Sequence, residues 1–234
     1  MKQNDSLPLD PARTRRARRR GIMLVILAAA SFSISAAFAK TIGTGIPVAE
    51  VIFFRNFFAL VPLLPVVIGA GGLAALRMRK PGSHILRTIF GMTGMVGSFY
   101  GYVYLPLVTV TALGFTMPLF LTLLAIPILG EKVGWRRWLA VLVGFCGVLL
   151  MVRPEQGSTD TQWFALGLCL LGALAWALAM ITIRKMGEAG ESGVAIVFWF
   201  AFFSALLAGI AMIPVWIWPS PTQWALLAGI GLVS

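Results

Sequence analysis

The stretch VAEVIFFRNFFALVPLLPVV, residues 48–67, decides the fold. It is about as long as a helix must be to cross the roughly 30 Å hydrocarbon layer of a membrane. Arg55 in its interior costs about 2.5 to 3.5 kcal/mol to insert, whereas each Leu, Ile, Phe or Val contributes about 0.3 to 0.6 kcal/mol in favour. Because the apolar side chains outweigh the charge, the stretch is predicted to span a membrane.

The composition of the whole chain supports a membrane protein. Of its 234 residues, 59% are hydrophobic and 12% are charged, and the mean hydropathy is +0.91. One soluble core cannot bury so large an apolar fraction. The net charge of +11 would indicate nucleic acid binding in a soluble protein. Here the basic residues lie almost entirely between apolar segments, so we expect a lipid bilayer as partner and no nucleic acid.

Seven apolar segments are long enough to cross. They are residues 21–39, 48–70, 85–104, 107–129, 135–152, 163–183 and 193–215. They lack the alternation of barrel strands, so the predicted fold class is an all-α integral membrane protein. The stretch from Trp224 to Ser234 reads as part of an eighth span, which leads us to expect an incomplete sequence.

The positions of Lys and Arg predict the orientation, because basic residues near span ends are held on the cytoplasmic side. Most of them lie in the tail of residues 1–20 and in the second, fourth and sixth loops. To the second loop we assign Arg77, Arg79, Lys80 and Arg87. The prediction is a multi-pass membrane protein with a cytoplasmic N-terminus. A cleavable signal ending at Ala39 is the alternative for the first span.

A shift of 145 residues places the chain on itself. Ala28 then falls on Ala173, Lys40 on Lys185, Gly45 on Gly190 and Phe53 on Phe198. A repeat of five spans is odd in number, so its second copy enters the membrane the other way up, as in many secondary transporters. We divide the chain into a basic cytoplasmic tail (1–20), a first five-helix repeat (21–152) and an incomplete second repeat (163–234).

Three motifs carry a resemblance to a known family. VAEVIFFRNFFAL (48–60), TALGFTMPLFLTLLAIPILGEKVGWRRW (111–138) and LVGFCGVLLMVRP (142–154) resemble the EamA branch of the drug/metabolite transporter superfamily. HILR (84–87) and MPLF (117–120) are also similar to S-adenosylmethionine uptake carriers within that branch. The resemblance implies ten helices in two five-helix repeats around a central cavity, of which this chain holds about seven and part of an eighth.

The leading hypothesis, which draws on this resemblance, is a secondary transporter of a bacterial inner membrane that moves a small organic metabolite by alternating access. The substrate expected is amino-acid, nucleoside-like or vitamin-like, with S-adenosylmethionine among the candidates. No P-loop motif for ATP is present. A non-transporting membrane scaffold or a truncated inactive carrier is the alternative, and a homodimer is left open.

An enzyme is not expected, because the sequence offers no facing acids, histidines or metal set. His84 is the only histidine, and Cys146 and Cys169 stand alone. We therefore predict no catalytic residue, no metal and no cofactor.

Arg55 and Asn56 are the first candidates for the substrate cavity. An intramembrane arginine faces the bundle by default and meets either a helix end or an anionic group of the substrate. A role in helix packing and topology is the alternative. Glu50, near the outer end of the same span, is the candidate for proton coupling, unless it stays ionised at the interface.

The other cavity candidates are polar or aromatic residues inside spans. Pro118 removes a hydrogen bond to the carbonyl of Gly114 and is expected to bend its helix, with Thr116 nearby; an ordinary kink with self-bonded hydroxyls is the alternative. Trp176 and Trp199 either stack on a planar substrate or touch lipid. Tyr100 and Tyr104 share one helix face and line the cavity or form an interfacial belt. The small residues Gly91, Gly94, Gly97, Ser98 and Gly101 predict close helix packing.

Overall fold

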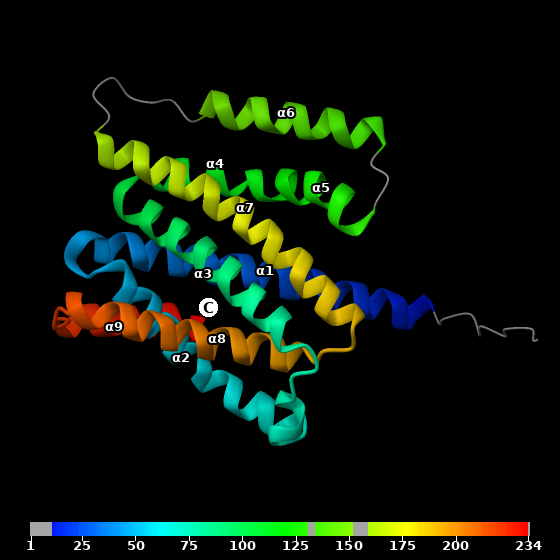
Figure 1. Cartoon of the computed structure of the whole chain (residues 1–234), viewed down its shortest axis with the longest axis horizontal. Helices are drawn as coiled ribbons and strands as arrows, with labels where there is room; N and C mark the ends of the chain where they lie inside the picture. Colours follow the sequence, from blue (N-terminus) through cyan, green and yellow to red (C-terminus); the bar gives the residue numbers. More distant parts are fainter. Residues whose placement is uncertain (1–10, 131–133, 152–158, 234) are drawn as a thin grey trace, which may run out of the picture.

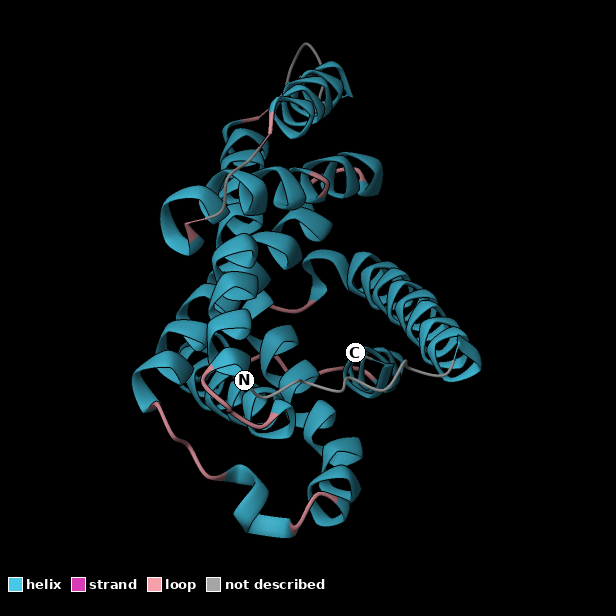
Figure 2. Cartoon of the chain, turned by 90° about the vertical axis from the view of Figure 1, so that its right-hand side faces the viewer, coloured by secondary structure: helices cyan, strands magenta, loops and turns pink. Residues whose placement is uncertain are grey.

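A computed structural model describes residues 11–130, 134–151 and 159–233 of the chain, and these residues form helices and loops without a strand (Figures 1 and 2). The α-helices are α1 (Pro11–Ile42), α2 (Val48–Gly69), α3 (Pro81–Tyr104), α4 (Leu107–Gly114), α5 (Thr116–Leu129), α6 (Trp135–Met151), α7 (Asp160–Glu188), α8 (Gly193–Met212) and α9 (Pro221–Val233). Short 3₁₀ turns are η1 (Gly43–Gly45), η2 (Gly72–Leu76) and η3 (Ile213–Val215). The all-α prediction is confirmed.

Every predicted span coincides with helix in the described residues. Among the residues that the structure describes, five segments are long and apolar enough to cross a membrane: Gly21–Gly45, Val48–Gly69, Leu107–Leu129, Asp160–Glu188 and Gly193–Val215. The two other predicted spans correspond to α3, which carries polar residues in its first turns, and to α6, which is 17 residues long.

The predicted bend at Pro118 is a break between α4 and α5 at Phe115. Pro118 has no N–H for the carbonyl of Gly114, so the helical ladder is interrupted there. The buried hydroxyl of Thr116 donates to the carbonyl of Leu113, and the hydroxyls of Thr111 and Thr122 donate to carbonyls of their own helices. These bonds favour the ordinary kink.

Small residues of α3 allow close contact with α7. A Cβ added to Gly97 would overlap the carbonyl oxygen of Leu168, and one on Gly94 would lie 2.7 Å from the indole nitrogen of Trp176. Figure 1 shows the two helices side by side along most of their length. The prediction that the small residues of α3 allow close helix packing is confirmed.

Two apolar clusters hold the described part of the bundle together. The larger one joins α1, α2, α3, α8 and α9, and its most buried members include Ile46, Ile52, Met95, Leu227 and Ile230. The smaller one joins α3, α4 and α7 around Leu105, Val110, Leu113, Ala165 and Cys169. The larger cluster surrounds the segment that carries Arg55.

The placement of Arg87 in the second basic loop was wrong. Arg87 lies in the second turn of α3 with 8% of its surface exposed. It faces the bundle because it shares a helix face with Gly91 and Gly94, which pack inward.

Part of the charge map lies outside the described residues. Lys2, Lys132 and Arg153 lie outside them, and so does Ser234, the last residue of the predicted partial eighth span. Residues 11–20 of the predicted tail are the first turns of α1.

Candidate functional site

Arg55 extends from α2 toward α3. Its Nη1 atom lies 3.1 Å from the sulfur of Met95, a residue that is 1% exposed. The neighbouring Asn56 is buried, and its amide donates to the carbonyl of Ile52 at 2.8 Å with the Met95 sulfur at 3.5 Å. Arg55 and Asn56 therefore both border the same side chain of α3, in the middle of the bundle.

Arg87 lies on the same face of α3, two helical turns before Met95. The carbon atom of its guanidinium stands 3.8 Å from the centre of the Phe200 ring and 5.9 Å from that of Trp176. Gly91 makes room for this arrangement, since a Cβ there would overlap both Arg87 and Phe200. Cation–π contacts of this kind contribute about 0.5 to 2 kcal/mol each.

Trp176 completes the group from α7. Its indole N–H lies 3.4 Å from the hydroxyl of Ser98, and its ring packs on Gly94. Arg55, Met95, Trp176 and Phe200 come from four helices, and Arg87 joins them from α3. We call these five residues the arginine–aromatic cluster. The spacing of Arg87, Gly91 and Gly94 at helical intervals was the sequence signal that could have revealed Arg87.

Tyr100, Tyr104 and Thr116 belong to a different part of the bundle. The two tyrosine rings are 4.4 Å apart, and Tyr100 meets Phe164 of α7 edge to face at 5.6 Å. Thr116 lines a cavity of about 320 Å³ between α4, α5, α6 and α7. The tyrosines pack against the smaller apolar cluster, and Pro118 is exposed nearby on α5.

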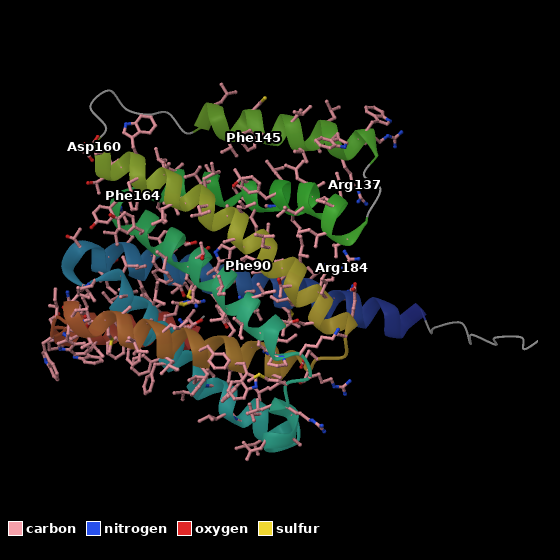
Figure 3. All side chains as sticks on the ribbon, viewed as in Figure 1. Phe90, Arg137, Phe145, Asp160, Phe164 and Arg184 are labelled. Atoms are coloured by element: carbon pink, nitrogen blue, oxygen red, sulfur yellow. The ribbon has the colours of Figure 1, made fainter. Side chains whose placement is uncertain are left out.

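A second cavity of about 370 Å³ lies between α5, α6 and α7. Arg137 and Arg184 line it and lie toward the same end of the bundle, whereas Asp160 lies at the other end (Figure 3). Arg184 also contacts Glu188 at 3.2 Å in an exposed pair.

Trp199 lies apart from the arginine–aromatic cluster. Its indole N–H donates to the carbonyl of Leu76 at 2.7 Å, and its ring stacks on Phe203 at 5.3 Å. Trp199 thus fastens the connection between α2 and α3 to α8.

Glu50 is buried in the first turn of α2. One carboxylate oxygen accepts from the backbone N–H of Ile217 at 3.3 Å, and the other has no hydrogen-bond partner in the described structure. Glu50 therefore connects α2 to the segment between α8 and α9.

A buried pair that the sequence did not reveal joins His84 of α3 to Glu191 in the turn before α8. Their Nε2 and Oε2 atoms are 3.6 Å apart. Burial raises the pKa of Glu191, but hydrogen bonds from the backbone N–H groups of Lys80 and Arg79, together with the nearby His84 imidazole, outweigh burial and leave this pKa below its usual value. No local pattern pairs residues so far apart in sequence.

No group of three potential metal ligands occurs in residues 11–130, 134–151 and 159–233. Cys146 is exposed and Cys169 is buried, and both are free thiols. The Cys169 sulfur lies 3.2 Å from the carbonyl oxygen of Gly97, which is a packing contact between α7 and α3.

Comparisons with known proteins identify the family. The model of the EamA-like transporter family matches residues 19–153. The S-adenosylmethionine uptake transporter of Rickettsia prowazekii is 34% identical over 90% of this chain and 70% of its own length. The pseudopaline exporter of Pseudomonas aeruginosa is 30% identical over 92% of this chain and 74% of its own. The riboflavin transporter of Vibrio cholerae is 29% identical over 92% of this chain and 72% of its own.

A solved crystal structure of another protein shares the fold of this chain. It superposes with a TM-score of 0.64 over 88% of this chain and 73% of its own, at 15% sequence identity. The relatives named above are transporters, in agreement with the prediction that the chain is not an enzyme. The chain therefore belongs to the EamA-like transporter family and is a multi-pass membrane transporter of small molecules.

Proposed function

We propose that this chain is a secondary transporter of a bacterial inner membrane that carries a small organic metabolite by alternating access, with its N-terminus in the cytoplasm. The observation that carries this proposal is that two arginines lie inside the bundle: Arg55 of α2 contacts Met95 of α3, and Arg87 of α3 stands beside Trp176 of α7. Ionisable residues inside membrane bundles mark solute pathways. S-adenosylmethionine is the first substrate to test, because relatives of this chain are named S-adenosylmethionine uptake transporters.

The arrangement of helices supports an inverted repeat. The shift of 145 residues relates α1 to α7, α2 to α8 and α3 to α9. Under this correspondence, the contact of α1 with α9 is equivalent to the contact of α7 with α3. The contact of α2 with α8 is equivalent to itself. A pseudo-two-fold axis between α2 and α8 accounts for this pattern, and rocking of two such halves is how many secondary transporters alternate access.

In this proposal Arg55, Asn56 and Trp176 contact the substrate, and Glu50 is the coupling group. Glu50 fits a coupling role because it is a buried carboxylate with one unpartnered oxygen where α2 meets the α8–α9 connection. The roles of Tyr100, Tyr104, Thr116, Pro118 and Trp199 in a cavity stay predictions.

Uptake into proteoliposomes tests the proposal. The purified chain is reconstituted and supplied with radiolabelled S-adenosylmethionine, and then with a panel of labelled amino acids, nucleosides and vitamins. We expect saturable uptake of at least one compound above that of protein-free liposomes, and reduced uptake by Arg55→Ala. Absence of uptake across the whole panel by well-folded protein would contradict a carrier and favour the scaffold alternative.

A further inference from the structure

Arg87 carries a buried charge, and two of its three guanidinium nitrogens lack a hydrogen-bond partner among the described residues. It lies about 10 Å along α3 from the start of that helix. Its Nε and Nη1 atoms are buried and have no hydrogen-bond partner among the described residues. A guanidinium has five N–H donors and keeps its charge. Because unpaired buried donors and charges are costly, this site favours an anionic ligand.

No carboxylate of the described residues forms an ion pair with Arg87. Glu50 binds the backbone of Ile217, and Glu191 binds that of Arg79 and Lys80. Asp160 and Glu188 lie at the two ends of α7. The arginine is therefore not the internal partner of an acidic residue in this part of the chain.

The side chains that lie against the Arg87 guanidinium are aromatic. Phe200 covers one face of the guanidinium, and Trp176, which is only partly buried, stands beside it. One turn beyond Phe200 on the same face of α8, the hydroxyl of Ser204 is fully buried and has no hydrogen-bond partner in the described structure. Two aromatic rings therefore lie against this cation, and one neutral hydrogen-bonding group lies one turn further along α8.

The second cation, Arg55, adds to the preference for an anion. Its Nη1 atom touches Met95, and the Nη1 atom of Arg87 touches Gly91, so the two heads lie about one helical turn, or roughly 6 Å, apart along α3. A carboxylate suits this site better than a phosphate, because a single negative charge costs less to desolvate in apolar surroundings than two.

We propose that Arg87 binds a carboxylate group of the transported solute, with Phe200 and Trp176 holding a planar part of the same molecule. This assignment rests on the proposed transport function and narrows its substrate class to carboxylate-bearing metabolites with a flat ring. Planar guanidinium groups recognise carboxylates through paired N–H donors, and they also stack on aromatic faces.

A matched pair of probes tests the carboxylate. N-acetyltryptophan and N-acetyltryptophanamide have the same ring and nearly the same size, but only the first has a carboxylate. Binding of each to the full chain in nanodiscs is measured by titration calorimetry, with phenyl phosphate as a third probe. We expect the acid to bind about 10- to 100-fold more tightly than the amide, the range that charge-assisted hydrogen bonds provide.

Variants connect this preference to Arg87. Arg87→Gln is expected to reduce the preference for the acid to about two-fold or less, and Arg87→Lys to retain part of it. Arg77→Gln is the control, since Arg77 is an exposed arginine of the preceding loop, and it should keep the wild-type preference. Size-exclusion chromatography confirms that each variant is folded.

Three results would overturn the assignment. One is equal binding of acid and amide by the wild-type chain, which decides the question even if no Arg87 variant folds. Another is an undiminished preference in folded Arg87→Gln, and a third is tighter binding of phenyl phosphate than of the acid. Binding in nanodiscs does not require transport. An Arg87-dependent acid preference without uptake in proteoliposomes would therefore refute the transport proposal alone, and uptake without that preference would refute the carboxylate site alone.

Discussion

The Oε1 atom of Glu191 accepts a hydrogen bond at 2.7 Å from the backbone nitrogen of Lys80, a residue 111 positions earlier in the chain. The same oxygen accepts another at 2.7 Å from the backbone N–H of Arg79. One carboxylate thereby ties the connection between α2 and α3 to the turn between α7 and α8.

Replacing Glu191 with Gln should destabilise the chain by about 2 kcal/mol, because two charge-assisted hydrogen bonds become neutral ones and the contact with His84 is lost. Thermal unfolding in detergent measures the effect. Glu188→Gln is the control. Because Glu188 and its partner Arg184 are both more than half exposed, this replacement should change the stability by no more than about 0.5 kcal/mol. Equal midpoints for the two variants would contradict the tie.

Acid should weaken the same contact. The pKa of Glu191 in the folded chain lies below its ordinary value of 4.5. Its contribution to stability is therefore complete above pH 4.5 and is lost as the pH falls from there through the lower folded-state pKa. We expect the wild-type chain to lose stability over this window more steeply than Glu191→Gln, as measured by chemical denaturation at a series of pH values. Parallel profiles would refute the role of Glu191.

Gly97→Ala should weaken the contact between α3 and α7. The added methyl group would meet the carbonyl oxygen of Leu168, which is backbone and cannot turn away. We expect a loss of about 1 to 3 kcal/mol in unfolding measurements, the usual cost of overpacking. Gly167→Ala is the matched control on α7, since a Cβ there meets nothing within 4 Å. Its stability should be unchanged or slightly higher, because alanine favours helix over glycine.

Arg55→Ala should impair folding or uptake far more than Arg77→Ala. Arg55 contacts Met95 inside the bundle, whereas Arg77 is exposed in the loop before α3. If Arg55 binds substrate, its loss should reduce uptake by about 10-fold or more. Initial rates in proteoliposomes, normalised to reconstituted protein, provide the comparison. Similar rates for the two variants would contradict a role for Arg55 in the solute pathway.

Cysteine labelling in whole cells tests the orientation. Leu73 in η2 is 86% exposed and should face the cytoplasm, whereas Thr222 at the start of α9 should face the outside. In a background without Cys146 and Cys169, a reagent that cannot enter cells should modify Thr222→Cys and spare Leu73→Cys. Permeabilised cells serve as the control, because both positions should then react. Modification of Leu73→Cys but not of Thr222→Cys in intact cells would show that the predicted orientation is wrong.

The sequence by itself determined the helical spans, the helix break near Pro118 and the close packing of the glycine face of α3. Each of these depends on local chemistry. The bilayer requires a minimum length of apolar helix, proline lacks an N–H, and glycines spaced at helical intervals leave a groove on one side of a helix. The family motifs likewise lie within single segments of the chain, so they were recognisable without the fold.

Only the tertiary structure decided where Arg87, Glu191 and Trp199 belong. Arg87 counts as a loop charge in sequence, yet it is buried because the face it shares with Gly91 packs against Phe200. Glu191 and Lys80, like Trp199 and Leu76, meet across more than a hundred residues. Such pairs depend on which helix faces come together, and helix packing is set by the summed fit of many side chains and not by any local pattern.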